Sequence, residues 1–177
     1  MLKKVVIAIG VAIVLFLGFA ATREDQYRVE RSTKIAASAE QVFKMIDNFH
    51  EWEAWSPWAK IDPAMKTTYS GAASGTGAIY RWVGNDQVGE GQMEVLATTP
   101  GESVKIKLDF LKPFASTNST DFTIKPNEGG VTVNWVMVGQ KDFMAKVVMM
   151  FMDMDKTIGA DFEKGLQQMK TAAEAKK

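Results

Sequence analysis

The chain has 177 residues, 46% hydrophobic and 24% charged, which is enough for one domain with a substantial core and too few for two. Its 21 basic residues balance its 21 acidic ones, so it lacks the basic excess typical of nucleic-acid binding. The absence of cysteine excludes disulfides, thiolate catalysis and thiolate metal sites, and the single histidine, His50, excludes sites that need two imidazoles.

The N-terminal segment is uniformly apolar from Val5 to Ala21 and follows Lys3 and Lys4. A run of this length lies at the lower limit for a helix that spans the hydrocarbon core, and it also fits a signal peptide cleaved after Ala20. We expect a retained anchor, with a cleaved signal as the alternative. A buried helix of a globular core is disfavoured because it would need protein on every side.

The orientation of this segment depends on which basic residues are counted. A short basic start normally stays in the cytoplasm, whereas four basic residues between Arg23 and Lys34 favour the opposite arrangement. We expect a single-pass protein of the cell membrane with its domain on the extracytoplasmic side. Residues 1–25 would be the anchor or signal segment, and residues 26–177 the domain.

The first part of the domain combines a strand with short helices. Residues 26–36 carry β-favouring side chains and predict a first strand. Ser38 stands three residues before Gln41, as in a capping box, and apolar residues at helical spacing then predict an amphipathic helix to Ile46. Residues 50–54 are expected to add another turn or two of helix.

An antiparallel meander follows, with glycine, proline and asparagine at its turns. Alternation is clearest over residues 104–110 and 131–137, where apolar and polar side chains take opposite faces. This pattern is typical of an antiparallel sheet with one buried face. The predicted strands are 66–70, 76–84, 89–98, 102–111, 115–125 and 130–139.

The C-terminal segment, residues 143–177, is predicted to be one continuous helix, because its apolar residues recur every three or four positions. Gly159 and Gly165 each disfavour a helix by about 1 kcal/mol relative to alanine, and we expect them to allow close approach to the sheet. The apolar stripe consists of Val147, Phe151, Met154, Ile158, Phe162, Leu166, Met169 and Ala173.

Several short motifs, in this order of elements, carry a resemblance over roughly residues 27–175. They are Trp55–Trp58, Gly77–Asn85, Gly89–Gly91, Leu108–Phe114, Trp135–Gly139, Met152–Asp155 and Gly159–Leu166. The chain resembles the SRPBCC superfamily of START-like lipid-binding domains, in the branch of polyketide cyclase/dehydrase and lipid transport proteins.

This resemblance implies an α+β helix-grip fold, in which a curved antiparallel sheet wraps around a long C-terminal helix and encloses a cavity for an apolar or amphipathic ligand. The superfamily includes carriers, receptors, cyclases, oxygenase domains and co-chaperone activators, so the resemblance does not fix a reaction.

Aromatic and apolar side chains supply the candidate ligand site. Three of the five tryptophans lie at positions 52, 55 and 58, where Pro57 argues against a continuous helix. They suit a packed end of the core, a ligand-lining wall or a membrane-interface patch. The expected cavity-lining residues are Trp55, Trp58, Tyr80, Trp82, Phe110, Trp135, Phe151, Met154 and Ile158.

Methionines are concentrated between positions 144 and 154, where flexible thioethers suit either ordinary helix core or a cavity for variable apolar shapes. The run Met149–Met152 must wrap around a helix, so part of it would be exposed or covered by another element. An exposed apolar patch beside a membrane tether would be an interaction surface. The acidic residues of the C-terminal helix are expected on a solvated face rather than in a metal site.

We therefore expect a membrane-anchored domain that binds a lipid-like molecule in its sheet–helix cavity, with no catalysis, no cofactor and no nucleic-acid partner. One alternative is a cyclase or hydrolase in which Tyr80, Arg81, Asn118 or Thr120 polarises a carbonyl group. Another is a protein-interaction module of the co-chaperone kind, which a filled core would favour. Nothing in the sequence specifies an oligomeric state.

Overall fold

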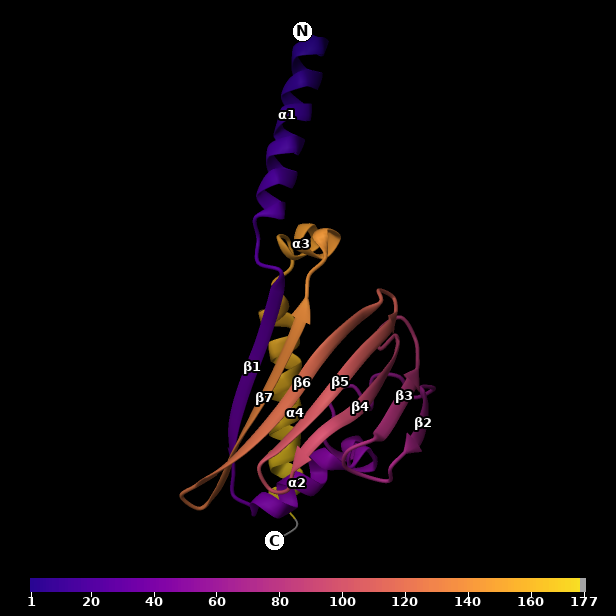
Figure 1. Cartoon of the computed structure of the whole chain (residues 1–177), viewed down its shortest axis with the longest axis vertical. Helices are drawn as coiled ribbons and strands as arrows, with labels where there is room; N and C mark the ends of the chain where they lie inside the picture. The colour runs from indigo at the N-terminus through magenta and orange to yellow at the C-terminus, as the bar shows by residue number, and fades with distance from the viewer. Residues whose placement is uncertain (176–177) are drawn as a thin grey trace.

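A seven-stranded antiparallel sheet forms one layer of the domain, and the long helix α4 (Met154–Glu174) packs against it (Figure 1). The computed structural model describes residues 1–175. The strand order is β1-β7-β6-β5-β4-β3-β2, so the first and last strands of the chain are neighbours. The strands are β1 (Gln26–Ile35), β2 (Lys66–Gly71), β3 (Ala78–Val83), β4 (Glu90–Thr99), β5 (Ser103–Lys112), β6 (Ser116–Asn127) and β7 (Gly130–Gln140).

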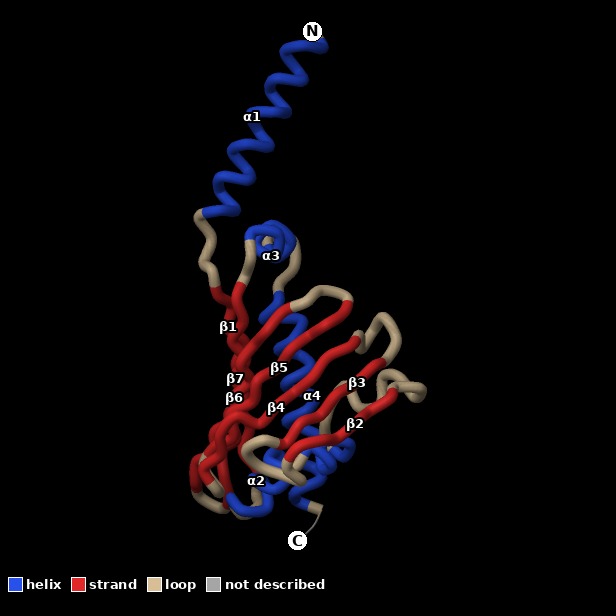
Figure 2. The backbone as a smooth tube through the Cα atoms, turned by 45° about the vertical axis from the view of Figure 1, so that its right-hand side comes forward, coloured by secondary structure: helices blue, strands red, loops and turns tan. Residues whose placement is uncertain are grey.

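Helix α1 (Leu2–Ala21) projects away from this domain (Figures 1 and 2). Ala20 is its one fully buried residue. Among residues 1–175 it is the one helix whose length and composition suit a membrane span, and a signal sequence would meet the same test. The N-terminal segment that was expected to be an anchor or signal is therefore a helix, and the rest of the protein leaves most of its surface uncovered.

The short helices α2 (Ala39–Asp47) and η1 (Phe49–Ala54) follow β1 and lie at the end of the domain far from α1. The Ser38 side chain accepts a hydrogen bond from the Gln41 N–H at 3.2 Å, which is half of the predicted capping box. Gln41 does not complete the box. Its side-chain amide donates to the Ala173 carbonyl at 2.7 Å and thereby connects α2 to the end of α4.

The prediction of one continuous helix over residues 143–177 is wrong. The structure has a short helix α3 (Phe143–Met149), a connection over residues 150–153 and then α4. Asp153 is extended, with φ −83° and ψ 95°, and its side chain accepts from the Lys156 N–H as the N-cap of α4. A helix therefore restarts at this aspartate, and the chain changes direction. Residues 176–177 of the predicted helix lie outside the described residues.

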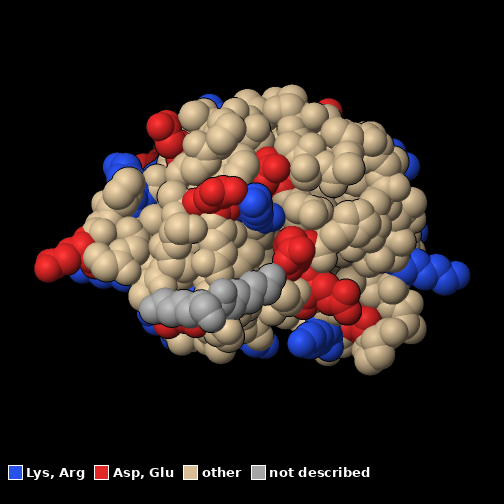
Figure 3. Space-filling model, turned by 90° about the horizontal axis from the view of Figure 1, so that it is seen from below, with Lys and Arg blue, Asp and Glu red and all other residues tan. Residues whose placement is uncertain are grey.

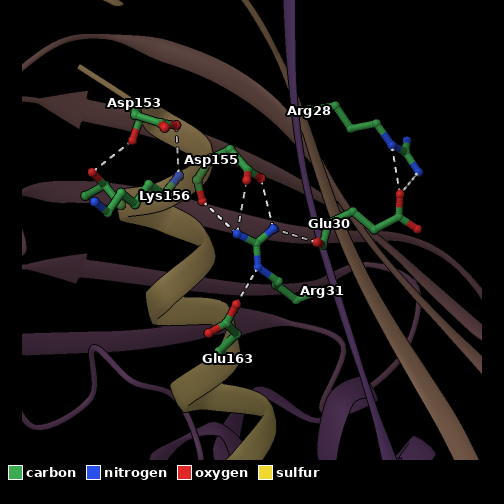
Figure 4. Close-up of polar contacts among 8 residues, drawn as sticks. Arg28, Glu30, Arg31, Asp153, Asp155, Lys156 and Glu163 are labelled. Carbon is green, nitrogen blue, oxygen red and sulfur yellow. Dashed lines mark hydrogen bonds and ion pairs between the residues drawn. The ribbon is translucent and has the colours of Figure 1, made fainter. Parts of the chain in front are cut away.

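Close approach of α4 to the sheet is confirmed at both glycines. A Cβ on Gly159 would overlap the Arg31 guanidinium of β1, and one on Gly165 would lie 3.0 Å from the Trp135 ring of β7. Arg31 reaches over Gly159 and pairs with Asp155 at 2.9 Å and Glu163 at 2.7 Å (Figure 4). The acidic face of α4 therefore meets β1 through one shared guanidinium.

The predicted alternation of the sheet is confirmed in β5 and β7. Val104, Ile106 and Leu108 are buried on one face, as are Val131, Val133 and Trp135. Charge follows no comparable segregation. On the end of the molecule opposite α1, described acidic and basic side chains are interspersed (Figure 3), as the zero net charge suggests.

Candidate functional site

A cavity of about 660 Å³ lies between the sheet, α4 and the segment that joins α2 to β2. Its inner wall comes from β3, β4, β5, β6 and β7, and its other walls from η1, residues 56–67 and the first half of α4. The buried or half-buried side chains that line it are Phe49, Trp52, Ser56, Trp58, Ala59, Asp62, Met65, Tyr80, Trp82, Val88, Met93, Leu108, Phe110, Thr120, Trp135, Met137, Ile158, Asp161 and Phe162. Asp161, expected on the solvated face of the C-terminal helix, is half-buried and borders the cavity.

One wall of the cavity is a continuous array of aromatic rings. Tyr80 and Trp82 alternate with exposed Arg81 on β3 and stack with ring centroids 6.0 Å apart. Phe110 meets Trp82 edge-on at 5.9 Å, and Phe49 approaches Tyr80 at the same distance. These separations are within the range at which aromatic pairs attract. The wall is therefore rigid as well as apolar.

Gly91 of β4 makes room for the Trp82 indole. A Cβ on Gly91 would overlap the indole ring and lie 2.6 Å from the Asp109 carbonyl oxygen. Gly89 adopts φ +65°, and the Trp82 Nε1–H donates to the neighbouring Val88 carbonyl at 2.9 Å. In the Gly89–Gly91 motif, Gly91 therefore leaves space for Trp82, while Gly89 takes a left-handed turn conformation in which a Cβ would overlap the Lys112 carbonyl.

The inner end of the cavity is closed by a stacked core. Trp135 lies parallel to Phe162 of α4, with centroids 3.9 Å apart and planes at 8°. Its Nε1–H donates to the Thr120 hydroxyl at 2.9 Å, and that hydroxyl donates to the Val136 carbonyl at 3.4 Å. Thr120 is 2% exposed, so both its hydrogen bonds stay within the protein.

The tryptophan cluster at positions 52–58 divides into three roles. Trp52 and Trp55 donate their Nε1–H groups to the carbonyls of Ile46 and Met45 at 2.9 and 2.8 Å, and so satisfy acceptors that the end of α2 leaves free. Trp52 also lines the cavity, whereas Trp55 is fully buried behind it. Trp58 is half-buried and meets Trp135 edge-on at 5.9 Å on the cavity wall.

Polar groups gather where exposed residues mark the opening of the cavity, at Glu53, Lys60 and Gln87. Buried Asp62 accepts from the backbone N–H groups of Ala64 at 2.9 Å and Asn85 at 2.7 Å. Its carboxylate thereby joins the loop before β2 to the β3–β4 loop.

Deeper inside, burial and the neighbouring Tyr69 raise the pKa of Tyr80 to about 12, so its phenol is neutral at physiological pH.

The structure brings together six of the nine residues expected to line the cavity: Trp58, Tyr80, Trp82, Phe110, Trp135 and Ile158. Trp55 lies behind the cavity, in the packed core. Phe151 and Met154 lie elsewhere because the helix breaks before Asp153. They border a more open groove of about 780 Å³ between that connection and the ends of β1 and β7.

Other lining residues escaped the sequence prediction although signals for them existed. Leu108 and Met137 alternate with residues already assigned to the inner face, and Phe162 belongs to the predicted apolar stripe of α4. Trp52 and Phe49 had no such signal, since their place depends on how η1 folds over the sheet. The one histidine, His50, stacks on Tyr69 at 3.8 Å and is not among the cavity-lining residues.

No group of three or more histidine, cysteine, aspartate or glutamate residues within positions 1–175 is placed to hold a metal ion. On α4, Asp155 and Glu163 are held by Arg31, and Asp153 serves as an N-cap. The arrangement instead defines a helix-grip domain with an internal, mainly apolar cavity.

Comparison with known families places the chain within that class. Residues 26–174 match the family described as polyketide cyclase / dehydrase and lipid transport. Because this match covers most of the chain, the protein belongs to that family, part of the SRPBCC superfamily. The comparison with curated proteins finds no match.

Solved structures share the fold at low sequence identity. A protein from Rhodobacter sphaeroides has a TM-score of 0.63 and 15% identity, over 85% of this chain and 93% of that one. The protein named Ara h 8.0201 has a TM-score of 0.58 and 9% identity, over 85% and 99%. The di-domain ARO/CYC StfQ from the steffimycin biosynthetic pathway has 0.61 and 11%, over 85% and 51%.

Proposed function

We propose that this protein binds a hydrophobic or amphipathic, lipid-like small molecule in the aromatic cavity and performs no chemistry on it. The observation that carries the proposal is the cavity itself, about 660 Å³ and lined mainly by apolar side chains. Small-molecule sites typically measure roughly 300–1,000 Å³ and combine apolar walls with a few polar groups. Membership of a family described as including lipid transport supports the same conclusion.

The distribution of polar groups favours an amphipathic ligand. The aromatic wall and methionines would surround an apolar body, while Glu53, Lys60 and Gln87 stand at the opening, where a polar end would meet water. Inside, the neutral Tyr80 phenol can donate a hydrogen bond to a carbonyl or hydroxyl group. We infer that the ligand enters with its apolar end first.

Binding has more support than catalysis. General acid–base chemistry needs a positioned group whose pKa lies near neutrality, and the chain's single imidazole stacks on Tyr69 instead of lining the cavity. The Tyr80 pKa is moved away from neutrality, and the Thr120 hydroxyl is engaged by Trp135 and Val136. A cyclase or hydrolase in this cavity would have to use its carboxylates, and of these Asp62 already accepts two backbone hydrogen bonds, which leaves Glu53 and Asp161.

The tether is the second part of the proposal. Helix α1 would cross the cell membrane once and hold residues 26–177 beside it. Its apolar surface and near-complete exposure support this role. Lys3 and Lys4 would stay in the cytoplasm, and the domain would then lie on the extracytoplasmic side.

A matched pair of substitutions on β5 tests the cavity as the ligand site. Leu108 lines the cavity and is 9% exposed, whereas Leu111 is 54% exposed. In the full chain in detergent, Leu108→Trp should abolish the fluorescence gain of bound anilinonaphthalene sulfonate and its displacement by fatty acids or phospholipids. Leu111→Trp should leave both unchanged.

Native mass spectrometry of the full chain, extracted from its own host, supplies the ligand's mass. We expect a stoichiometric small molecule that is retained by Leu111→Trp and lost from Leu108→Trp. Near-ultraviolet circular dichroism would verify that both variants keep the tryptophan core. Absence of a bound molecule, together with no binding across a lipid panel, would overturn the carrier proposal.

A further inference from the structure

Helix α3 and the connection to α4 lie next to the base of α1 (Figures 1 and 2), and they carry a group of exposed apolar side chains. We call these residues the α3 patch. They are between 44% and 77% exposed. The α3 patch consists of Phe143, Met144, Val148, Phe151 and Met152. Apolar side chains gathered in this way usually mark a contact surface.

Direct contacts fix the height of the α3 patch along α1. The Phe151 ring lies 5.9 Å from the ring of Phe16, and Ala20, one turn further on, is the buried residue of α1. Phe16 precedes the end of the helix by five residues, which corresponds to about 7.5 Å along its axis. Phe151 therefore lies beside the apolar part of α1 and not beside the end of the helix, where the polar residues begin.

The length of α1 shows how deep in a bilayer Phe16 and Phe151 would lie. Its 20 residues measure about 30 Å, close to the thickness of a bilayer's hydrocarbon core. A spanning α1 must therefore use nearly its whole apolar length, and Phe16 then lies inside the hydrocarbon layer. Because Phe151 touches Phe16, it must enter the same layer. This step rests on the proposed role of α1 as a membrane span.

The charged residue of α3 fits the same placement. Lys146 forms an ion pair with Asp25 and approaches the Ala21 carbonyl at 3.5 Å, where the apolar run of α1 ends. Its side chain is 10% exposed and is held at the polar end of α1, while neighbouring apolar side chains stay exposed. A basic residue at the polar edge beside exposed phenylalanine and methionine is typical of a helix lying in a membrane interface.

We propose that the α3 patch is inserted into the lipid surface, so that the domain is seated on the bilayer and not suspended from a free tether. Of the possible occupants, lipid is the one that must already surround α1 at this height. Seating would hold the domain in one orientation and would keep the groove beside Met149–Asp155 at the membrane.

The absence of cysteine makes a depth measurement direct, since any introduced cysteine is the only one. Full-length chain in phosphatidylcholine–phosphatidylglycerol liposomes would carry a nitroxide at Met144→Cys or Met152→Cys. Val11→Cys in α1 is the membrane reference, and Glu128→Cys in the β6–β7 turn, at the far end of the domain, is the aqueous one. Each label is tested for collision with oxygen, which concentrates in lipid, and with a neutral nickel chelate, which stays in water.

We expect the labels at Met144 and Met152 to resemble Val11, with an oxygen-to-nickel collision ratio several-fold above that of Glu128. If the Met144 and Met152 labels give the same ratio as Glu128 while Val11 gives a lipid-like ratio, the α3 patch is not inserted, although α1 still spans the membrane. A water-like Val11 would refute the tether and the seating together. Labels shielded from both reagents would show that protein covers the patch, which also overturns the proposal. Dye binding in the cavity is scored separately, so each failure can be assigned.

A charge variant supplies an independent check. Phe151→Asp combined with Met152→Asp should move the Met144→Cys label toward water and lower its oxygen-to-nickel ratio to that of Glu128. The Val11 reference should stay lipid-like, and near-ultraviolet circular dichroism should be unchanged because both side chains are exposed. An unaltered Met144 ratio in this variant would contradict insertion of the α3 patch.

Discussion

The sheet has two halves that are covered in different ways. Strands β1 and β7 lie against α4, where Trp135 stacks on Phe162 and Arg31 bridges to the helix. Strands β2, β3 and β4 face the cavity and the irregular segment from η1 to residue 65. Seven strands span about 29 Å at their usual spacing, while a helix is about 10–12 Å wide. One helix covers only part of such a sheet, so the cavity follows from the architecture.

These two kinds of cover separate stability from binding. In the covered half, side chains such as Trp135 pack between sheet and helix, and the cavity begins at their edge. In the other half, aromatic rings meet the sheet on one side and empty space on the other. Truncating a side chain should therefore reduce stability more in the first half and alter ligand binding more in the second, because fewer packed atoms surround the rings there.

The strongest test of this comparison is truncation of one tryptophan from each half. Trp135 is 2% exposed and contacts both Phe162 and Phe122, so Trp135→Ala should lower the free energy of unfolding by about 3–5 kcal/mol. Both rings border the cavity, but the nearest ring partners of Trp82 lie 5.9 and 6.0 Å away, whereas those of Trp135 lie 3.9 and 4.8 Å away. Trp82→Ala should therefore lower the free energy of unfolding by less. Urea denaturation measures both. Equal losses would remove the distinction between the halves.

The sequence predicts the parts of these two halves in which apolar residues recur at a regular spacing. The alternation in residues 104–110 and 131–137 predicted β5, β7 and their inner faces, because one face of each strand is buried against the core. Repeated spacing also predicted α4 and its approach to the sheet at Gly159 and Gly165. Both features are local patterns imposed by regular secondary structure.

The irregular segments could not be predicted in the same way. Trp52, Trp55 and Trp58 are identical in type and evenly spaced, yet they respectively line the cavity, fill the core and close the wall. Their places depend on the path from α2 to β2, which no period describes. The break before α4 had a signal in Asp153, an N-cap residue, but the apolar spacing continues across it and concealed the restart.

A second test adds a methyl group behind the aromatic wall of the cavity. Gly91→Ala would place a methyl group against the Trp82 ring and a backbone carbonyl that has little freedom to move. We expect destabilisation near the upper end of about 1–3 kcal/mol, with a shift in tryptophan fluorescence as the indole is displaced into the cavity. Thermal unfolding of Gly91→Ala, Trp82→Leu and the double variant completes a double-mutant cycle. If the two losses of stability simply add, the Trp82 ring is not what the added methyl group meets.

A third test concerns the hydrogen bond at the boundary between the halves. Thr120→Val keeps the shape of the side chain but removes the acceptor of the Trp135 indole, leaving a buried N–H unpaired. The expected loss is about 1–2 kcal/mol in the free energy of unfolding. Thr120→Ser retains the hydroxyl and should lose less. A valine variant as stable as the native chain would show that the hydroxyl is dispensable.

The smallest expected effect lies at the edge of the covered half, in the contact of Arg31 with α4. The hydrogen bond from Arg31, reinforced by its charge, holds the pKa of Asp155 below its ordinary value. A carboxyl whose folded-state pKa is lowered stabilises the fold fully above its unfolded pKa and loses that contribution as pH falls through the folded value. Stability should therefore decline on acidification partly through this pair.

Replacing the Arg31 guanidinium tests the direction of this pH dependence. Arg31→Met should be less stable than the native chain at neutral pH, and the difference should shrink as the solution is acidified below the Asp155 pKa. Lys44→Met removes a pair in which both side chains are largely exposed, and its effect should be smaller at every pH. Urea unfolding across the acid range measures these differences. A gap between native and Arg31→Met that stays constant as the pH falls would mean that the guanidinium stabilises α4 by packing over Gly159 and not through its acidic partners.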